Sequence, residues 1–322
     1  MIRYVPEQVT ANLINCAMAI KATCQAYLAV LDADTSSFPV VLAHGSEPRN
    51  RFSIKSSRAR DVAGLKIGSY WPGNTAAGRR NHNSCILLFD QDSGRIDTVI
   101  EAGLANAYRT AAGNELAVSK LARTEARHLA IFGAGNQAFF ECQAVLNVRP
   151  INTISIVNRD PDRARQLADR LADRSSDVRI VDAQTACQDA DVIVTATGAR
   201  APLFESGWVR PGTHISCMGA DAPGKQELPV QLHHRADLYC DFVGQSTAIG
   251  EFQHIAGEIR AGLLKATNLG VVLAGQCEGR RSDAAITIFD SSGLSLQDLY
   301  LARLLLSEAG CRGQIVELRS AS

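Results

Sequence analysis

The two glycines at positions 133 and 135 have a spacing that is typical of a nucleotide-binding turn. The apolar run 129–132 leads directly into Gly133-Ala134-Gly135-Asn136-Gln137-Ala138, a G-x-G-x-x-A pattern that opens a helical stretch. In a dinucleotide-binding unit the first glycine permits a tight turn, the second lets the backbone approach a pyrophosphate, and the small third residue lets the helix pack on the strand. The anion lies at a helix N-terminus, which favours negative charge. The pattern predicts an NAD(H) or NADP(H) site formed by Gly133, Ala134, Gly135, Asn136 and Gln137.

The residue that contacts the adenine ribose is expected just after the second strand of such a unit. That predicted strand, Thr153–Val157, runs into Asn158 and Arg159. An acidic side chain there would accept from the ribose 2′-hydroxyl and favour NAD, whereas Asn158 with Arg159 could hold a 2′-phosphate. The sequence therefore favours NADP. The alternative is that Arg159 is a solvated residue at the entry to the next helix.

Lys66 and Arg109 are candidate substrate residues. Lys66 lies between Leu65 and Ile67 in an apolar, strand-like run, and burying an ammonium group is costly unless it has a partner or a task. Arg109 is followed by small residues that leave its guanidinium room for a bidentate pair with a carboxylate. The alternatives are that Lys66 faces solvent on an edge strand and that Arg109 forms a structural salt bridge.

Asp221 lies in a glycine-rich turn, 219–224, after a predicted strand. Open α/β sheets bind ligands at the carboxyl ends of their strands, so its carboxylate is a candidate ligand contact, although turn capping is the common use of such a residue. His82 and His254 are weaker candidates, because a lone histidine is more often a satisfied core or surface group. Lys55 is one of several basic residues that could bind a second substrate carboxylate.

Composition excludes several classes of function. Lys+Arg and Asp+Glu each number 33 in 322 residues, so no net charge attracts nucleic acid or an anionic membrane. No apolar run approaches the roughly 18 residues of a spanning helix, and no signal pattern opens the chain, which predicts a cytoplasmic protein. The nine cysteines occur singly and predict reduced core residues and no metal site. The expected partner is a small molecule.

The elements that carry Lys66 and Arg109 predict an α+β domain. Apolar residues recur at helical spacing over 7–31, which indicates one amphipathic helix. Strand-like runs at 38–42, 52–55, 63–67, 85–89 and 96–100 predict an antiparallel or mixed sheet, with a hairpin turn at 90–94. Residues 106–122 return to helical composition, with Arg109 in the first turns.

The remaining chain alternates strands with helices. The predicted strands are 128–132, 153–157, 178–181, 192–195, 214–218, 238–240 and 285–289, and the predicted helices are 136–148, 161–174 and 296–309. This alternation is typical of a doubly wound parallel sheet. We therefore predict an α/β protein with a Rossmann NAD(P)-binding domain at 117–295. Residues 1–116 and 296–322 would form a second, α+β domain for substrate binding and dimerisation.

Several segments resemble the ornithine cyclodeaminase/μ-crystallin superfamily, and the resemblance covers nearly the whole chain. The segments are Leu65-Lys66-Ile67, Trp71-Pro72-Gly73-Asn74, Asn81-His82-Asn83-Ser84, Tyr108-Arg109-Thr110-Ala111-Ala112, 132–136, 219–228 and 289–293. Within that family the chain is most similar to the imino acid reductase branch. Cyclodeaminases of the family usually carry an Arg-Ile-Glu-Gly-Glu-like run where this chain has Ala248-Ile249-Gly250-Glu251, and this departure favours imine reduction over ornithine cyclisation.

The resemblance implies an NAD(P)H-dependent reductase of a small α-imino acid such as iminosuccinate. Arg109 would hold the α-carboxylate, Lys66 the carboxylate or the carbonyl-derived centre, and Asp221 would serve the substrate nitrogen, with His82 and Lys55 as further substrate contacts. Additional cofactor contacts are expected at Thr195, Thr197, Met218, Gly219 and Ser292. The family is commonly dimeric through the first domain, so a homodimer is expected. The alternatives are cyclodeamination with bound NAD and a non-catalytic protein that binds NAD(P)H and a small ligand.

Overall fold

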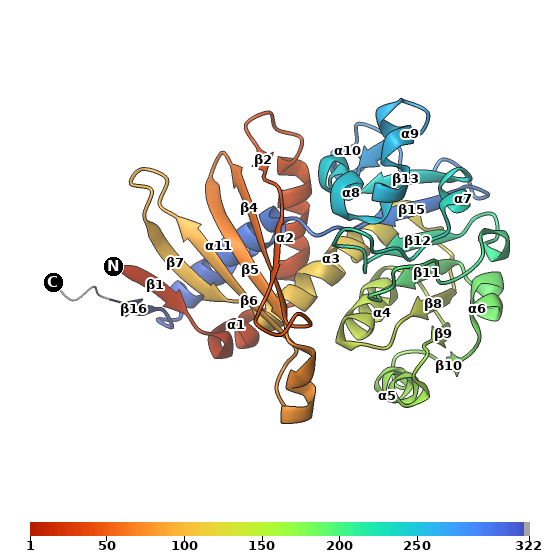
Figure 1. Cartoon of the computed structure of the whole chain (residues 1–322), viewed down its shortest axis with the longest axis horizontal. Helices are drawn as coiled ribbons and strands as arrows, with labels where there is room; N and C mark the ends of the chain where they lie inside the picture. Colours follow the sequence, from red (N-terminus) through yellow and green to blue (C-terminus); the bar gives the residue numbers. More distant parts are fainter. Residues whose placement is uncertain (319–322) are drawn as a thin grey trace. The chain divides into compact units, whose positions relative to one another are not determined.

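The computed structural model describes residues 1–318, which divide into two compact units. Unit 1 consists of residues 1–109 together with the chain from Leu294 onward, and unit 2 consists of Thr110–Gly293. The division falls inside one helix, α3 (Gly103–Leu121), directly after Arg109. Each unit is built on its own β-sheet (Figure 1).

Unit 1 contains a mixed sheet of eight strands, which confirms the predicted sheet domain. The strand order is β16-β1-β7-β6-β5-β4-β2, and β3 also pairs with β4. The strands are β1 (Ile2–Val5), β2 (Ser36–Ser37), β3 (Val41–His44), β4 (Arg51–Ala59), β5 (Val62–Tyr70), β6 (His82–Phe89), β7 (Ile96–Glu101) and β16 (Val316–Leu318). The β1–β7 pair is parallel and the other pairs are antiparallel. Side chains therefore alternate between two faces along each strand.

One face of this sheet is covered by the C-terminal helix. The helices of unit 1 are α1 (Glu7–Leu13), α2 (Cys16–Ala29), η1 (Pro72–Ala77), α11 (Ser295–Cys311) and the first turns of α3. Helix α11 packs against β4, β5 and β6, and α2 packs against α11 (Figure 1). The single helix predicted over 7–31 is wrong. Ile14 is extended, and the Asn15 side chain accepts a hydrogen bond from the Met18 N–H at 2.9 Å, so Asn15 caps a second helix.

Unit 2 is a doubly wound parallel sheet, as predicted. Its strand order is β10-β9-β8-β11-β12-β15-β13-β14, and every pair is parallel. The strands are β8 (His128–Phe132), β9 (Thr153–Val157), β10 (Asp177–Ile180), β11 (Val192–Thr195), β12 (His214–Cys217), β13 (Ala236–Cys240), β14 (Ala266–Asn268) and β15 (Ile286–Asp290). The chain proceeds outward from β8 in one direction and from β11 in the other. Such a switch point is where open α/β sheets bind ligands.

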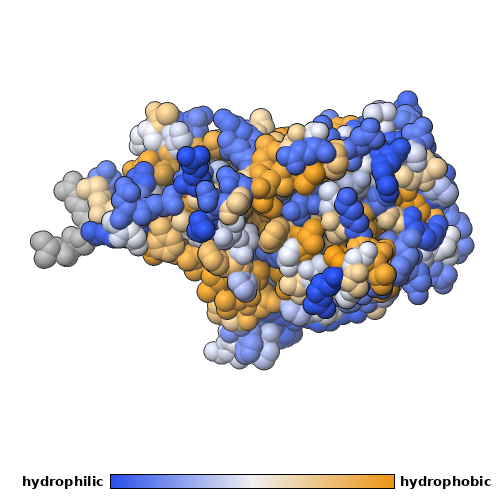
Figure 2. All heavy atoms as spheres, turned by 90° about the horizontal axis from the view of Figure 1, so that it is seen from above, coloured by the Kyte–Doolittle hydropathy of each residue, from blue (hydrophilic) through white to orange (hydrophobic). Residues whose placement is uncertain are grey.

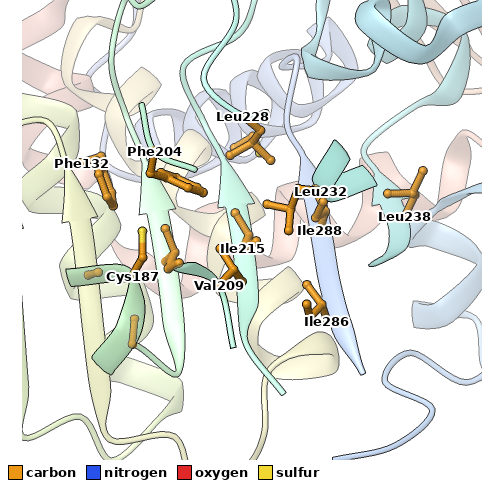
Figure 3. Packing of buried hydrophobic residues seen from close by; sticks show 14 of the residues in the cluster. Phe132, Cys187, Phe204, Val209, Ile215, Leu228, Leu232, Leu238, Ile286 and Ile288 are labelled. Atoms are coloured by element: carbon orange, nitrogen blue, oxygen red, sulfur yellow. The ribbon is translucent and has the colours of Figure 1, made fainter. Parts of the chain in front are cut away.

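The helices of unit 2 cover the two faces of this sheet. They are α4 (Asn136–Val148), α5 (Pro161–Leu171), α6 (Ala183–Asp189), η2 (Ser206–Trp208), α7 (Val230–His233), α8 (Val243–Ile249), η3 (Glu251–Ile255), α9 (Ala256–Arg260) and α10 (Leu269–Leu273). On one face Phe132, Ile215 and Ile288 of three strands pack with Phe204 and Leu232 (Figure 3). Strands buried on both faces read as continuous apolar runs, which is why the sequence located the central strands, whereas the short, half-buried strand β14 was not predicted.

The cysteines differ from the prediction. Cys142, Cys187, Cys217 and Cys240 are buried core residues, but the core prediction is wrong for three others, which are exposed: Cys16, Cys277 and Cys311. No disulfide joins any of the cysteines in the described part of the chain. Across residues 1–318, none of the helices combines the length and the hydrophobicity that crossing a membrane requires.

Candidate functional site

Unit 1 gathers Lys55, Lys66 and Arg109 on the covered face of its sheet. Lys55 of β4 lies directly opposite Lys66 of β5, and both are buried. Arg109 lies on α3 and is 7% exposed. The sheet register and the helix thus bring three cationic side chains, far apart in sequence, into one buried region. The prediction that Lys66 is buried is confirmed, and the edge-strand alternative is wrong because β5 is flanked by β4 and β6.

Two polar residues connect Lys66 with Arg109. The Lys66 ammonium donates to Asp298 Oδ1 at 2.9 Å and also to Asn106 Oδ1. Arg109 Nη2 donates to the same Asn106 oxygen at 2.8 Å, and Arg109 Nε forms an ion pair with Asp298 Oδ1 at 3.2 Å. Asn106 and Arg109 are three residues apart on α3, so both project from one side of the helix. The four side chains form a closed ring, here called the Lys66–Asp298 ring, in which each oxygen faces both cations.

This ring sets the protonation state of Lys66. Burial, followed by the positive charge of Arg109, lowers the pKa of Lys66 to about 7, while Asp298 opposes this shift and Lys55 adds to it. An ammonium group with a pKa near neutrality exchanges its proton readily at physiological pH. The arrangement can therefore bind an anion and supply a proton at the same place.

Asn106 and Asp298 were not identified from the sequence. Asp298 and Gln297 are polar residues among the leucines of α11, and both are buried. A carboxylate on a buried helix needs a partner, so this pattern was a usable signal. Asp298 Oδ2 is also buried and accepts no hydrogen bond from the described residues. The partner itself could not be read from the sequence, because it depends on how α11 packs on β5.

His82 lies at the start of β6, opposite Tyr70 at the end of β5. The two rings have centroids 4.7 Å apart, and His82 is exposed. Tyr70 is four residues along β5 from Lys66, so His82 lies toward the far end of the strand pair and is not part of the Lys66–Asp298 ring. Its substrate role remains a prediction.

The turn between β8 and α4 has the geometry of a pyrophosphate-binding loop. Gly133 has φ +109°, and a Cβ there would lie 2.7 Å from the Ala196 carbonyl oxygen, so glycine is required. Gly135 is the N-cap of α4 without a side-chain cap, and a Cβ on it would meet no atom within 4 Å. The N-terminus of this 13-residue helix thus has open space beside Gly135, with Ala134, Asn136 and Gln137 as its neighbours in the chain. These residues fit a dinucleotide pyrophosphate.

Asn158 and Arg159 follow β9, as predicted. The Asn158 amide donates to the Asp160 carbonyl at 2.8 Å, and Arg159 is exposed. The Asp160 carboxylate caps α5 by accepting from the N–H groups of Asp162 and Arg163. Its negative charge is therefore largely committed to the helix terminus.

Glu227 organises the loops after β11 and β12. Its buried carboxylate accepts from the Thr195 hydroxyl at 2.7 Å, from the N–H and hydroxyl of Thr197 at 2.8 and 2.7 Å, and from the Gly219 N–H at 3.0 Å. Met218 is buried beside them, and its N–H bonds to the Thr195 carbonyl. Glu227, which the sequence did not single out, thus holds together three of the predicted cofactor residues, and the fourth, Met218, bonds to Thr195.

A second buried acid supports Glu227. Glu251 accepts from the N–H groups of Glu227 at 2.9 Å and Leu228 at 2.8 Å. Burial raises the pKa of Glu251 to about 8, so it is largely protonated at neutral pH. Glu251 belongs to the run that departs from the cyclodeaminase pattern, and in this chain it supports the backbone.

Asp221 is exposed and pairs with Lys225 at 2.5 Å, and Lys225 also donates to the Gly219 carbonyl at 3.0 Å. The His254 ring contacts the Lys225 carbonyl at 2.8 Å, which gives that histidine a structural contact with the same turn. Ser292 is buried; its hydroxyl donates to Asp241 at 3.0 Å and accepts from Gln245 at 2.9 Å. Ser292 therefore stabilises the chain after β15, and its predicted cofactor contact remains a prediction.

Comparisons with known proteins extend over the whole chain. The iminosuccinate reductase of Paracoccus denitrificans (strain Pd 1222) is 35% identical over 319 residues, which are 98% of each chain. Its crystal structure in complex with NAD+ superposes with a TM-score of 0.89, at 34% identity and 99% coverage of both chains.

Two further solved structures have the same fold. The Δ1-pyrroline-2-carboxylate reductase of Thermococcus litoralis, in complex with NADH and L-proline, gives a TM-score of 0.89 at 25% identity, covering 98% of this chain and 100% of the other. An archaeal alanine dehydrogenase dimer with bound NAD gives 0.88 at 28% identity and 99% coverage of both. The model of the ornithine cyclodeaminase/mu-crystallin family matches residues 19–310. The chain therefore belongs to the ornithine cyclodeaminase/mu-crystallin family.

Proposed function

We propose that this protein is an NAD(P)H-dependent oxidoreductase that reduces a small α-imino acid, with iminosuccinate as the leading substrate. The observation that carries the proposal is the buried Lys66–Asp298 ring, which presents two cations, one with a pKa of about 7, in a chain with a dinucleotide-binding turn. The similarity to iminosuccinate reductase and to Δ1-pyrroline-2-carboxylate reductase supports the same reaction class.

In this proposal one unit binds the cofactor and the other binds the substrate. Unit 2, predicted as the domain 117–295, binds the cofactor through the β8–α4 turn and the loops held by Glu227. Unit 1, predicted as 1–116 with 296–322, binds the substrate and forms the dimer. When bound, NAD(P)H supplies a hydride to the imine carbon.

Three side chains act on the substrate. Arg109 clamps the α-carboxylate, which a guanidinium can hold through two parallel hydrogen bonds. Lys66 orients the same end of the substrate and stabilises its charge. Asp221 supplies or relays a proton to the substrate nitrogen. Before substrate binds, Lys225 donates a hydrogen bond to the Asp221 carboxylate. Lys55, opposite Lys66, is the candidate for binding a second carboxylate.

The cofactor preference is a finer part of the proposal. NAD+, NAD and NADH are the cofactors in the three similar structures. Arg159 is exposed beside the expected ribose position, and the Asp160 carboxylate is occupied by helix capping. Because a guanidinium at this position can pair with a 2′-phosphate, we propose that this chain uses NADPH at least as well as NADH.

A homodimer is also part of the proposal. The face of the unit 1 sheet opposite Lys66 carries a row of paired residues across four strands: Val41, Ile54, Ile67 and Cys85. Val41 and Ile67 are exposed, and hydrophobic side chains reach the surface over part of unit 1 in Figure 2. An apolar sheet face of this kind is suited to an interface with a second copy. The similar alanine dehydrogenase is a dimer.

The direct test is a spectrophotometric assay with both reduced cofactors. NAD(P)H absorbance should fall with oxaloacetate plus ammonium, which form iminosuccinate, and ornithine with NAD+ should give no product. Turnover of ornithine without net cofactor change would instead indicate cyclodeamination. Cofactor binding without turnover of any keto acid with ammonium, or of any cyclic imine, would indicate a non-catalytic binding protein.

The Arg109→Ala variant tests the carboxylate clamp. Removing one partner of a desolvated charge pair should weaken substrate binding by about 3–5 kcal/mol. The dissociation constant for NADH, measured by fluorescence titration, should stay near that of the wild type. Loss of NADH binding would show that Arg109 has a structural role instead.

A further inference from the structure

Asp298 occupies a central place in the Lys66–Asp298 ring. Its Oδ1 atom lies 2.9 Å from Lys66 Nζ and 3.2 Å from Arg109 Nε, so one oxygen contacts both cations. The carboxylate is 2% exposed, and both cations are also buried. Coulomb interactions are strong in such a site because little water screens them.

The charges around Lys66 come from three elements. Lys55 faces it from β4, Arg109 from α3 and Asp298 from α11, while Asn106 of α3 is neutral. Lys55 and Arg109 favour loss of the Lys66 proton, and Asp298 opposes it. Among these charged neighbours, Asp298 is the one whose negative charge helps Lys66 to keep its proton.

The same contacts fix the direction of the donors. An ammonium group has three N–H donors, and two of those of Lys66 are directed to Asn106 and Asp298, which leaves one for a substrate. Arg109 donates from Nη2 to Asn106 and forms an ion pair with Asp298 through Nε, which leaves the two N–H groups of Nη1 and the second N–H of Nη2 for a carboxylate. The ring therefore affects the charge of Lys66 and the direction of the donors of both side chains.

We propose that Asp298 is a positioning residue that helps Lys66 to keep its proton, holds Lys66 and Arg109 side by side and directs their remaining donors to the substrate. This inference rests on the proposed function, because it gives Lys66 and Arg109 their role. Asp298 acts through these two residues. An opposite charge at this distance shifts a pKa by about 1–3 units, so without it Lys66 would lose its proton at neutral pH.

The first experiment compares Asp298→Asn with the wild type in the pH dependence of kcat/KM. The limb on which activity falls with rising pH should move to lower pH by about 1–3 units, and lowering the pH should restore kcat in part. The matched control is Asp61→Asn. Asp61 is also in unit 1 and contacts Tyr300 and Arg303 of α11, but the ion pair that it forms with Arg303 is exposed, unlike that of Asp298. In the control, the fall in kcat/KM with rising pH should occur at the same pH as in the wild type. Because substrate formation depends on pH equally for all three proteins, any difference between them is due to the enzyme.

The second experiment does not need turnover. Acetic anhydride reacts with the neutral amine, and peptide mass spectrometry measures the labelling of Lys66 as a function of pH. The midpoint should be about 7 in the wild type and lower by about 1–3 units in Asp298→Asn. If the wild type reduces no imino acid, the proposed function fails, but this titration still tests the role of Asp298.

An unchanged midpoint in a folded Asp298→Asn variant would overturn the proposal, even if activity were lost. If that variant does not fold, Asp298→Glu provides the test, since it retains the charge on a longer side chain. Its midpoint should stay near 7, and KM should rise more than kcat falls because Arg109 is redirected. If the midpoint of Asp298→Glu were instead lower by about 1–3 units, as predicted for Asp298→Asn, the proposal would be overturned as well.

Discussion

Lys55 is the residue whose substitution most directly tests substrate class. It is buried opposite Lys66, so a substrate that reaches Lys66 can place a second carboxylate nearby. We expect Lys55→Gln to lower kcat/KM for oxaloacetate with ammonium by about 10–100-fold, because a charge-assisted hydrogen bond contributes about 1.5–3 kcal/mol. Pyruvate with ammonium, which gives a monocarboxylate, should change little. Equal losses with both substrates would mean that Lys55 does not contact the second carboxylate.

Arg159 tests cofactor preference at the same scale. If its guanidinium pairs with a 2′-phosphate, Arg159→Ala should reduce kcat/KM for NADPH by roughly tenfold or more, about 1.4 kcal/mol, and leave NADH nearly unchanged. Arg165→Ala, an exposed arginine on α5 that pairs with Asp162, is the control and should alter neither. No effect on either cofactor would show that Arg159 points into solvent, and equal losses with both would show that it does not read the 2′-phosphate.

At the scale of elements, the β8–α4 turn contains two glycines with different physical roles. Gly133→Ala should destabilise the fold, because φ is +109° and the new Cβ would lie 2.7 Å from the Ala196 carbonyl. Gly135→Ala should keep the melting temperature, since its φ of −81° suits alanine and the Cβ meets no atom. Its new methyl group would instead occupy the space for the pyrophosphate. We expect weaker NADH binding without loss of stability; unchanged binding would place the pyrophosphate elsewhere.

The contact between η3 and the loop after β12 predicts a pH dependence of stability. Burial raises the pKa of Glu251 from 4.5 to about 8. A raised pKa means that the folded state holds the proton more tightly than the unfolded state. The resulting stabilisation is complete below about pH 4.5 and is lost as the pH rises through about 8.

The Glu251→Gln variant isolates this effect, because glutamine keeps an acceptor for the Glu227 and Leu228 N–H groups but has no charge to bury. The melting temperature of the variant minus that of the wild type should increase between pH 5 and pH 8 and then level off. The exposed Glu205→Gln should give a constant difference. A constant difference for Glu251→Gln as well would contradict the raised pKa.

At the scale of the whole molecule, dimerisation is the property most open to test. Ile67→Glu places a charge in the row of apolar residues on the open sheet face, and we expect a monomer by sedimentation velocity because a charge would have to be desolvated at the interface. The control is Ile180→Glu, an isoleucine of unit 2 that is similarly exposed, at 47%. A dimer that persists in Ile67→Glu would locate the interface on another surface.

The parallel sheet, the glycine-rich turn before α4 and the candidates Lys66 and Arg109 could be predicted from the amino-acid sequence. These features are local: buried parallel strands read as apolar runs, and the turn requires glycine at fixed positions. The break at Ile14 and Asn15 was missed because the apolar period continues across it, whereas the Asn15 cap depends on a single side-chain hydrogen bond.

The residues that complete the candidate site could be identified only from the folded chain. Asp298 is 232 residues from Lys66, and Glu227 is 32 residues from Thr195, so neither contact leaves a periodic signal in the sequence. Whether an acidic residue is a solvated surface charge or a buried partner depends on what packs over it. That burial raises the pKa of Glu251, lowers that of Lys66 and gives the site its chemistry, and it exists only once helix and sheet have packed together.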